Sequence, residues 1–303
     1  NFQLSTTKNK LISAKLPLGG FGISRYTLDL ELAKKAKENG ITIIQDEVLT
    51  VDFKKDLFYI ETKENKVFQS KIAIGAFGKR SLLDVKMERD FIKKKSPYLG
   101  VKIHVEGTFP EDLVALHNFK GGYCGVSKVD NNAINLCYIT NYSAFKKYKN
   151  IDDFQENVVF KNQFLKEIFK NTKPLFEKPL SISQISFETK NPIENHIIMC
   201  GDSAGMIHPL CGNGMSMAIQ SAQIASKLIL NYYEGVISSR SDLEKLYLRQ
   251  WNKQFKWRLK SGHFIAMLFR KDKIANILLQ ILRRVPFVLP LIIKQTHGKP
   301  MKL

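Results

Sequence analysis

The 303-residue sequence has little of what structural metal sites, secretion and membrane spans require. Its four cysteines, Cys124, Cys137, Cys200 and Cys211, form no Cys-x-x-Cys pair, which argues against a structural zinc site. The first residues do not resemble a secretory signal. No apolar run reaches the roughly 20 residues that cross a bilayer. We therefore expect reduced thiols and a cytoplasmic location.

Negative charge is also scarce, because 28 acidic residues stand against 47 Lys and Arg, for a net charge of +19. Such an excess suits nucleic acid, anionic lipid or an acidic substrate. Zinc-finger spacing, an aromatic-basic RNA motif and a helix-turn-helix signal are all missing, so we expect no nucleic-acid partner. A purely compositional explanation stays open, because Lys, Asn and Ile are abundant together and lysines then cover solvated faces.

The patterning of apolar residues predicts an α/β layer that is interrupted by an antiparallel sheet and then resumes. We expect a flexible lead-in over 1–23, then a helix that Ser24 caps and Asn39-Gly40 ends. Further helices are predicted over 151–169, 215–232 and most of the last part. Strands are predicted over 41–51, 57–62, 66–69, 72–76, 98–105, 113–119, 133–140, 180–188 and 197–200. The expected domains are 1–83, 84–190, 191–235 and 236–303.

The most informative segment runs from Cys200 to Met215 and joins a buried strand to a helix. Asp202 comes at the carboxyl end of the strand, where ligands bind in open α/β sheets. The helix that Gly212 and Gly214 open offers unpaired N–H groups and positive potential. Such a helix would stabilise the negative charge that a flavin ring gains on reduction, and Asp202 suits ribityl hydroxyls. The alternative is a glycine-rich loop with an aspartate cap.

The residues from Cys200 to Met215, taken in order, resemble the Gly-Asp motif of FAD-dependent oxidoreductases of the para-hydroxybenzoate hydroxylase fold. Within that superfamily the segment is most similar to the geranylgeranyl reductase branch. Ser24–Asp29 resembles the Arg-x-x-Leu-Asp helix, whose Arg lies beside the FAD. Ile74–Ser81 resembles the Asp-Gly motif near FAD and NAD(P)H, with Ile74 in place of the usual acid. The motifs come in the family's order, and the resemblance covers nearly the whole chain.

The resemblance implies a Rossmann-like FAD-binding domain, interrupted by an antiparallel-sheet substrate domain and followed by a helical C-terminus. It implies FAD as the cofactor and NAD(P)H as one candidate electron donor. The implied cofactor-binding residues are Arg25, Gly75, Ala76, Gly78, Gly201, Asp202, Ala204, Pro209, Gly212, Asn213, Gly214 and Met215.

The family's opening Gly-x-Gly-x-x-Gly turn and its ribose-binding acid are missing. Gly212-Asn213-Gly214 does not replace that turn, because it follows a loop rather than a strand. We therefore expect an N-terminally truncated chain whose first βαβ unit lies upstream of Asn1. Since the missing turn holds the pyrophosphate, we also expect the 303 residues alone to bind FAD poorly.

The substrate is not identified by a signature motif. The Tyr-x-Trp-x-Phe-Pro strand of prenyl reductases is not matched at 122–127, and the Trp-x-Trp-x-Ile-Pro motif of flavin halogenases is absent. Candidate catalytic groups are His208 and Cys211 in the glycine-rich loop and His117 in a strand, with His104 and Tyr123 beside them. A lone strand histidine more often serves packing, and the flavin itself carries the hydride step.

We thus expect an FAD-dependent oxidoreductase that uses NAD(P)H or another donor on a lipophilic, isoprenoid-like or quinone-like substrate. A flavin-dependent aromatic hydroxylase shares the fold, and a non-catalytic fragment is a third reading. Residues 274–303 mix apolar and basic side chains, with Pro286 and Pro290 interrupting any long helix. This suits peripheral membrane contact, although a tail packed on the FAD domain is the alternative. The oligomeric state is left open.

Overall fold

The computed structural model describes residues 1–16, 18–94, 96–183, 185–269, 272–285 and 287–297. Two compact units emerge, each built from segments that are distant in sequence. Unit 1 comprises Asn1–Ile43, Ser96–Ile185 and Ile265–Lys294. Unit 2 comprises Ile44–Lys95, Ser186–Phe264 and the chain end from Gln295.

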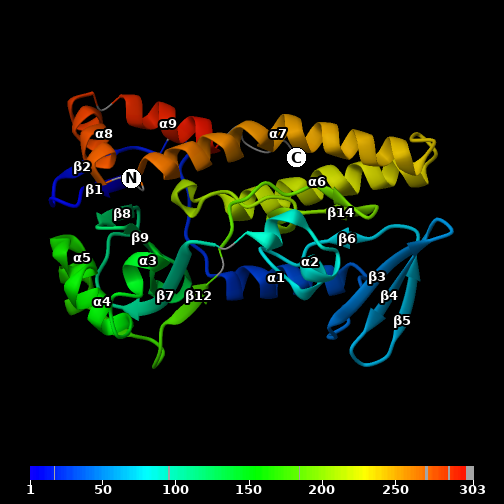
Figure 1. The fold of residues 1–303 in the computed structure, drawn as a ribbon, viewed down its shortest axis with the longest axis horizontal. Coiled ribbons are helices and arrows are strands. Elements are labelled where there is room, and N and C mark those ends of the chain that lie inside the picture. The colour runs from blue at the N-terminus through cyan, green and yellow to red at the C-terminus, as the bar shows by residue number, and fades with distance from the viewer. Residues whose placement is uncertain (17, 95, 184, 270–271, 286, 298–303) are drawn as a thin grey trace. The chain divides into compact units, whose positions relative to one another are not determined.

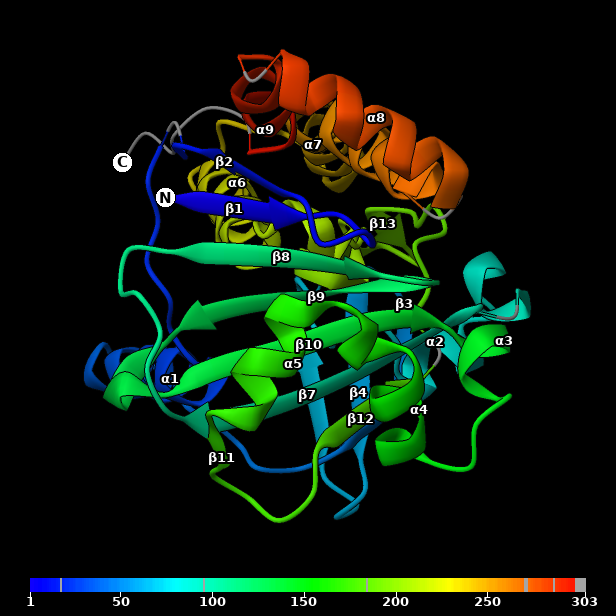
Figure 2. The same cartoon turned by 90° about the vertical axis from the view of Figure 1, so that its left-hand side faces the viewer.

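Unit 1 is built on an eight-stranded sheet with the order β11-β7-β10-β9-β8-β1-β2, in which β12 also pairs with β7. The central strands are antiparallel, as expected (Figure 2). The strands are β1 (Phe2–Ser5), β2 (Leu11–Ala14), β7 (Tyr98–Glu106), β8 (Val114–Phe119), β9 (Gly122–Lys128), β10 (Ile134–Asn141), β11 (Lys173–Pro174) and β12 (Leu180–Ser183).

The start of the chain is not the flexible lead-in that we expected. Strand β1 pairs in parallel with β8, and β2 pairs with β1. Each of the two strands has only four residues, too few for a period of two to stand out in the sequence. The pairing of β1 also depends on β8, more than 100 residues away, which local patterning cannot reveal.

One face of this sheet is covered by α3 (Tyr142–Phe145), α4 (Ile151–Asn157) and α5 (Gln163–Lys170), as Figure 2 shows. The single helix predicted over 151–169 is therefore wrong. Asn162 divides it, because its side chain accepts hydrogen bonds from the first amides of α5. The same side chain donates to Ser5 Oγ at 2.8 Å and to the Asn118 carbonyl at 2.9 Å.

Helix α1 (Arg25–Glu38) begins as predicted, with the Ser24 side chain accepting from the Thr27 amide. Asp130 reinforces this start, since it accepts from the Ser24 amide at 2.5 Å and from the Thr27 hydroxyl at 2.6 Å. These hydrogen bonds lower the pKa of Asp130 to about 2. The strand predicted to start at residue 41 begins only at Val48, because residues 41–47 find no strand partner in the described part of the chain.

Unit 2 contains two small sheets (Figure 1). One is antiparallel and consists of β3 (Val48–Lys54), β4 (Leu57–Thr62) and β5 (Val67–Ser70). The other has the order β13-β14-β6, with β6 (Ile74–Gly75) parallel to β14 (Ile197–Met199) and β13 (Ile193–Glu194) antiparallel. Its helices are α2 (Leu82–Lys86), α6 (Gly214–Tyr233) and most of α7 (Arg240–Phe269).

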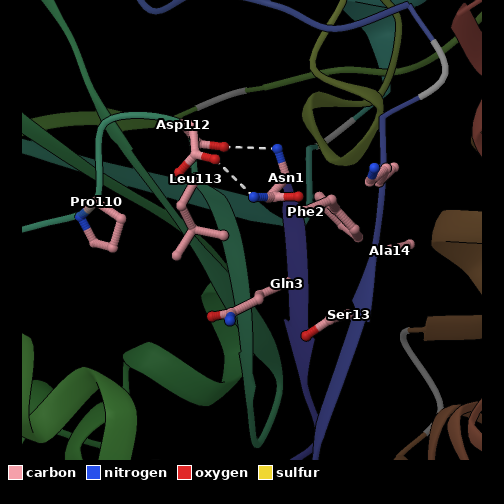
Figure 3. Close-up of a pocket in the computed structure, with 9 residues that line it drawn as sticks. Asn1, Phe2, Gln3, Ser13, Ala14, Pro110, Asp112 and Leu113 are labelled. Atoms are coloured by element: carbon pink, nitrogen blue, oxygen red, sulfur yellow. Dashed lines mark hydrogen bonds between the residues drawn. The ribbon is translucent and has the colours of Figure 1, made fainter.

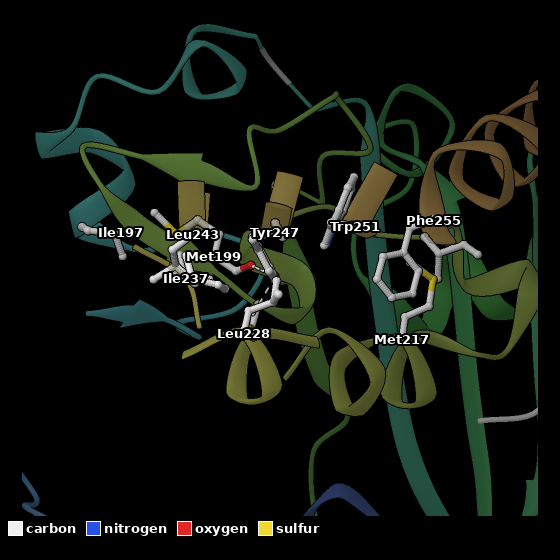
Figure 4. Close-up of a cluster of buried hydrophobic side chains, with 14 of the residues drawn as sticks. Ile197, Met199, Met217, Leu228, Ile237, Leu243, Tyr247, Trp251 and Phe255 are labelled. Atoms are coloured by element: carbon white, nitrogen blue, oxygen red, sulfur yellow. Dashed lines mark hydrogen bonds between the residues drawn. The ribbon is translucent and has the colours of Figure 1, made fainter. Parts of the chain in front are cut away.

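The core of unit 2 forms where α6 and α7 pack on β14. Figure 4 shows Leu228, Leu243 and Tyr247 gathered around Met199. The Tyr247 hydroxyl donates to the Met199 carbonyl at 2.5 Å, so the buried phenol has a partner. This core supports the carboxyl end of β14 from one side.

The last described elements are α8 (Asp272–Arg284) and α9 (Val288–His297). The break between them agrees with the interruption expected near residues 286–290, although Pro286 itself lies outside the described residues. In the searched part of the chain, no helix alone is long and apolar enough to cross a bilayer, whereas α8 and α9 taken together pass that test of length and composition across a bend of 119°.

Candidate functional site

Two glycine turns lie side by side at the carboxyl ends of neighbouring parallel strands in unit 2. Ile74 pairs with Ile198 and Gly75 with Met199, so β6 and β14 end at the same edge of their sheet. The turn after β6 is Gly75–Gly78, and the turn after β14 is the 3-10 helix Gly201–Ser203. This edge is where ligands bind in open α/β sheets.

Glycine is required at two of these positions for different reasons. A Cβ at Gly75 would lie 2.5 Å from Met199 Sδ and 2.8 Å from the Phe77 ring, so the two strands can approach only without a side chain there. Gly201 has φ +60°, a backbone conformation that side chains rarely adopt. The sequence therefore permits a tight junction between strand and turn.

Ser203 binds the two turns together. Its Oγ accepts from the Gly78 amide at 2.8 Å and donates to the Gly78 carbonyl at 3.2 Å. On the other side, the Gly201 amide donates to Ser221 Oγ of α6 at 2.9 Å. The Gly-Asp turn is thus anchored both to the neighbouring turn and to the helix that follows it.

The second half of the loop leads into a helix start. A 3-10 turn, Pro209–Cys211, ends at Gly212 with φ +65°, and α6 begins at Gly214. Over the described chain, a Cβ at Gly212 would meet no heavy atom within 4 Å. The first turn of α6 carries no acidic side chain, so its amides retain their positive potential. Met215 and Asp202 are both partly accessible.

His208 and Cys211 lie buried within the same loop. The imidazole of His208 packs on the Phe187 ring at 4.4 Å and accepts from the Leu210 amide at 3.4 Å. Burial, with a smaller effect of His263, lowers the pKa of His208 to about 4, so the ring is neutral at pH 7. Such a ring retains one acceptor and one donor nitrogen. A catalytic role for His208 and Cys211 stays a prediction.

His117 lies in unit 1, on the sheet face that the helices cover. Its Nδ1 is 2.9 Å from Ser5 Oγ, and its ring stacks on Phe164 at 5.4 Å. Burial lowers its pKa to about 4. Since all these contacts are internal to unit 1, they give His117 a packing role. The catalytic assignment stays a prediction.

Arg25 also belongs to unit 1, so the candidate residues are divided between the two units. It stands exposed at the start of α1 and pairs with Asp29 at 3.0 Å. The structure brings together the candidates of unit 2, namely Gly75, Ala76, Gly78, Gly201, Asp202, Ala204, His208, Pro209, Cys211, Gly212, Asn213, Gly214 and Met215.

The sequence analysis missed three residues of the site: Ser203, Arg89 and Lys190. Ser203 stands within the motif, but its bond to Gly78 joins residues 125 positions apart. Arg89 and Lys190 lie outside any motif. The only local signal was Ser81-x-x-Asp84, a capping box whose acid is buried and pairs with Arg89 at 2.8 Å.

A hollow in unit 1 lies elsewhere (Figure 3). Asn1, Ser13, Pro110 and Leu113 are among its lining residues. The carboxylate of its acidic residue, Asp112, accepts a hydrogen bond from the side-chain amide of Asn1 at 2.7 Å. It contains none of the candidate residues. Among the described residues, no group of His, Cys, Asp and Glu could hold a metal ion.

The residues of the two turns fit the ribityl and ring half of a flavin. The turns offer a carboxylate at a strand end and main-chain amides, and the loop after them offers an open approach at Gly212 and a helix start without acidic residues. Such donors suit hydroxyl groups and a ring that becomes negative on reduction.

Comparisons with known proteins find several proteins that this chain is similar to. The squalene epoxidase family model matches residues 155–268. The chain is 23% identical over 259 residues to a digeranylgeranylglycerophospholipid reductase of Methanosarcina acetivorans, covering 82% of this chain and 61% of the relative. It is 22% identical over 263 residues to conditioned medium factor receptor 1 of Dictyostelium discoideum, covering 81% of this chain and 49% of the relative. The chain therefore spans only part of the length of these curated relatives.

Solved structures give the same fold. A flavin-dependent brominase matches 98% of this chain and 76% of its own, with TM-score 0.75 and 18% identity. A geranylgeranyl bacteriochlorophyll reductase-like protein from Thermoplasma acidophilum matches 93% and 74%, with TM-score 0.73 and 16% identity. Both the resemblance and the α/β fold class expected from the sequence are confirmed.

Proposed function

We propose that this chain is an FAD-dependent oxidoreductase of the para-hydroxybenzoate hydroxylase fold and forms the flavin-ring and substrate portion of a reductase. The substrate would be lipophilic, isoprenoid-like or quinone-like, and NAD(P)H or another donor would supply the electrons. One observation carries the proposal: the turns Gly75–Gly78 and Gly201–Ser203 meet at the ends of parallel strands and lead to the open start of α6.

The bound flavin would supply the hydride chemistry. The chain's own residues would bind and orient it. Asp202 would accept hydrogen bonds from ribityl hydroxyls, and the first amides of α6 would stabilise negative charge on the reduced ring. The neutral ring of His208 would hold a proton without adding positive charge, because burial keeps its pKa near 4.

The lipophilic substrate is supported by the names of two comparisons. The Methanosarcina relative is a reductase of a geranylgeranyl lipid, and the matching family model is that of an epoxidase of squalene. Both compounds are isoprenoids. We therefore choose a polyprenyl lipid with isolated double bonds as the first substrate to test.

A second candidate, a flavin-dependent monooxygenase, is favoured by the epoxidase family model itself. Fold cannot separate the two. Reaction with reduced flavin in the absence of oxygen separates them directly: a reductase saturates the double bond, whereas a monooxygenase forms product only when oxygen is admitted. Strict dependence on oxygen, with an oxygenated product, would contradict the reductase proposal.

We also propose that α8 and α9 bind an anionic membrane surface. Helix α8 buries an apolar stripe that includes Leu279, and α9 buries one that includes Leu289. Further large apolar side chains of this region are exposed. The exposed apolar residues of this surface are Ile277, Ile281, Phe287 and Leu291, and its exposed basic residues are Arg283, Arg284 and Lys294. Apolar and cationic side chains at one surface suit a lipid interface. Both helices are labelled in Figure 2, and within unit 1 Asn276 of α8 accepts from Thr7 at 3.1 Å.

A further inference from the structure

A buried arginine lies against the Gly-Asp turn of unit 2. The side chain of Arg89 is 1% exposed. Its Nη1 donates to Asp84 Oδ1 at 2.8 Å and to the Ser203 carbonyl at 3.0 Å. Its Nη2 donates to the Asn191 carbonyl at 2.9 Å, and its Nε lies 3.4 Å from Glu194 Oε2. One guanidinium thus joins α2, the segment before β14 and the turn after it.

A buried lysine, Lys190, binds the same turn at Asp202, the residue before Ser203. Lys190 Nζ donates to the Asp202 carbonyl and to the Lys79 carbonyl, each at 2.7 Å. It also lies 4.3 Å from the centre of the Phe91 ring. Lysine is rarely buried, because removing an ammonium group from water is costly. Here two main-chain carbonyls accept from the ammonium group, one at the Gly-Asp turn and one just after Gly75–Gly78.

These two cations set the orientation of the turn's peptide groups. In a planar trans peptide, the carbonyl and the following amide point in opposite directions. Since the Asp202 carbonyl faces Lys190, the Ser203 amide points the other way. The Ser203 carbonyl faces Arg89 in turn. The carbonyl groups of two consecutive residues, Asp202 and Ser203, are therefore both held by buried, positively charged side chains.

We propose that Arg89 and Lys190 are positioning residues for the flavin, which keep the Gly201–Ser203 turn oriented against the Gly75–Gly78 turn. This inference rests on the proposed function, since it assigns a task within the same site. The residues act through main-chain carbonyls. The alternative is a structural tie with no effect on the cofactor.

The test uses Lys190→Met, which removes the charge and the donors but keeps an unbranched apolar chain. Lys245→Met makes the same change at an exposed position of α7. Titration with FAD, followed by flavin fluorescence, should give at least a tenfold higher Kd for Lys190→Met and an unchanged Kd for Lys245→Met. Lys190→Arg keeps a cation and several donors, so it should recover most of the affinity.

Two further measurements separate positioning from folding. In flavin-free protein, the amides of residues 201–205 should exchange with deuterium faster in Lys190→Met than in wild type. The reduction potential of bound flavin should shift in Lys190→Met and in Arg89→Lys, which keeps the charge that Asp84 requires. If Lys190→Met is folded and has the FAD Kd, the flavin reduction potential and the amide exchange rates of wild type, the inference is wrong. Absence of flavin binding by wild type would instead contradict the proposed function, whereas the exchange measurement would still test the tie.

Discussion

Ser203 Oγ lies 2.8 Å from the amide nitrogen of Gly78 and 3.2 Å from its carbonyl oxygen. A single buried hydroxyl therefore satisfies a donor and an acceptor of the neighbouring turn. This bond links the ends of β6 and β14, the two strands on which the candidate flavin site depends.

Ser203→Ala should destabilise unit 2, because it leaves the partly buried Gly78 amide without its hydrogen-bond partner. We expect a loss of about 1–3 kcal/mol in the free energy of unfolding, measured with urea. Ser226→Ala is the matched control, since Ser226 is an exposed serine of α6. Equal stability of the two variants would show that the link contributes nothing.

Asp202→Ala should lower flavin affinity without unfolding the protein. Loss of a hydrogen bond to a charged acceptor costs roughly 1.5–3 kcal/mol, or about a 10- to 150-fold rise in Kd. The flavin content of purified protein and an FAD titration both report this. The Kd of Asp202→Asn should lie between those of wild type and Asp202→Ala, because an amide oxygen still accepts hydrogen bonds. An unaltered Kd in Asp202→Ala would count against the ribityl assignment.

Gly214→Val tests the start of α6 in a different way. Among the described residues, a Cβ at Gly214 would meet only Ile207 Cγ2, at 3.9 Å, so the neighbouring chain has room for one. We therefore expect a valine to obstruct the approach of the flavin ring to the helix start and to abolish most FAD binding. The thermal unfolding temperature of flavin-free protein should change little. Retained FAD affinity would show that the ring does not approach this helix start.

The buried histidine of the loop predicts acid sensitivity. The pKa of His208 is lowered to about 4, whereas the unfolded chain has the ordinary value near 6.5. Between these values the unfolded state binds more protons, so stability falls as pH decreases from about 6.5 to 4. His208→Gln should lose less stability across this window than wild type. An NMR titration that placed the midpoint of the His208 ring near 6.5 would contradict the prediction.

The surface of α8 and α9 predicts binding to anionic vesicles. Arg283→Gln with Arg284→Gln should weaken co-sedimentation by about 2 kcal/mol, or roughly 30-fold, because each cation near such a surface contributes about 1 kcal/mol. Lys146→Gln with Lys147→Gln is the control, since both lysines are exposed elsewhere in unit 1. If wild type ignores anionic vesicles at low salt, the proposed membrane contact is wrong.

Local signals in the sequence predicted local structure well. Ser24 caps its helix as expected, because capping involves residues only three apart. The strand over 57–62 is also confirmed at both ends. By contrast, β1 depends on β8, and the division at Asn162 depends on contacts with Ser5 and Asn118. Such partners are distant in sequence, so no window of neighbouring residues contains them.

The same distinction applies to the site. Gly75 and Gly201 could be placed together from the sequence, because the family resemblance puts both motifs beside the flavin. The supporting residues could not be predicted from the sequence. Arg89 bonds Ser203, which is 114 positions away, and Lys190 bonds Lys79, which is 111 positions away. A buried cation leaves no pattern when its acceptors are main-chain carbonyls, which every residue possesses.

The central claim is that the two turns and the start of α6 hold a flavin. Titration of the purified protein with FAD, followed by its visible absorption and fluorescence, tests this most directly. The account predicts weak but saturable binding of one FAD, because the turn that holds the pyrophosphate is not among these residues. The flavin bands should be altered, and Asp202→Ala and Gly214→Val should weaken the binding further while Lys245→Met does not. Absence of binding, or equal binding by all four proteins, would contradict it.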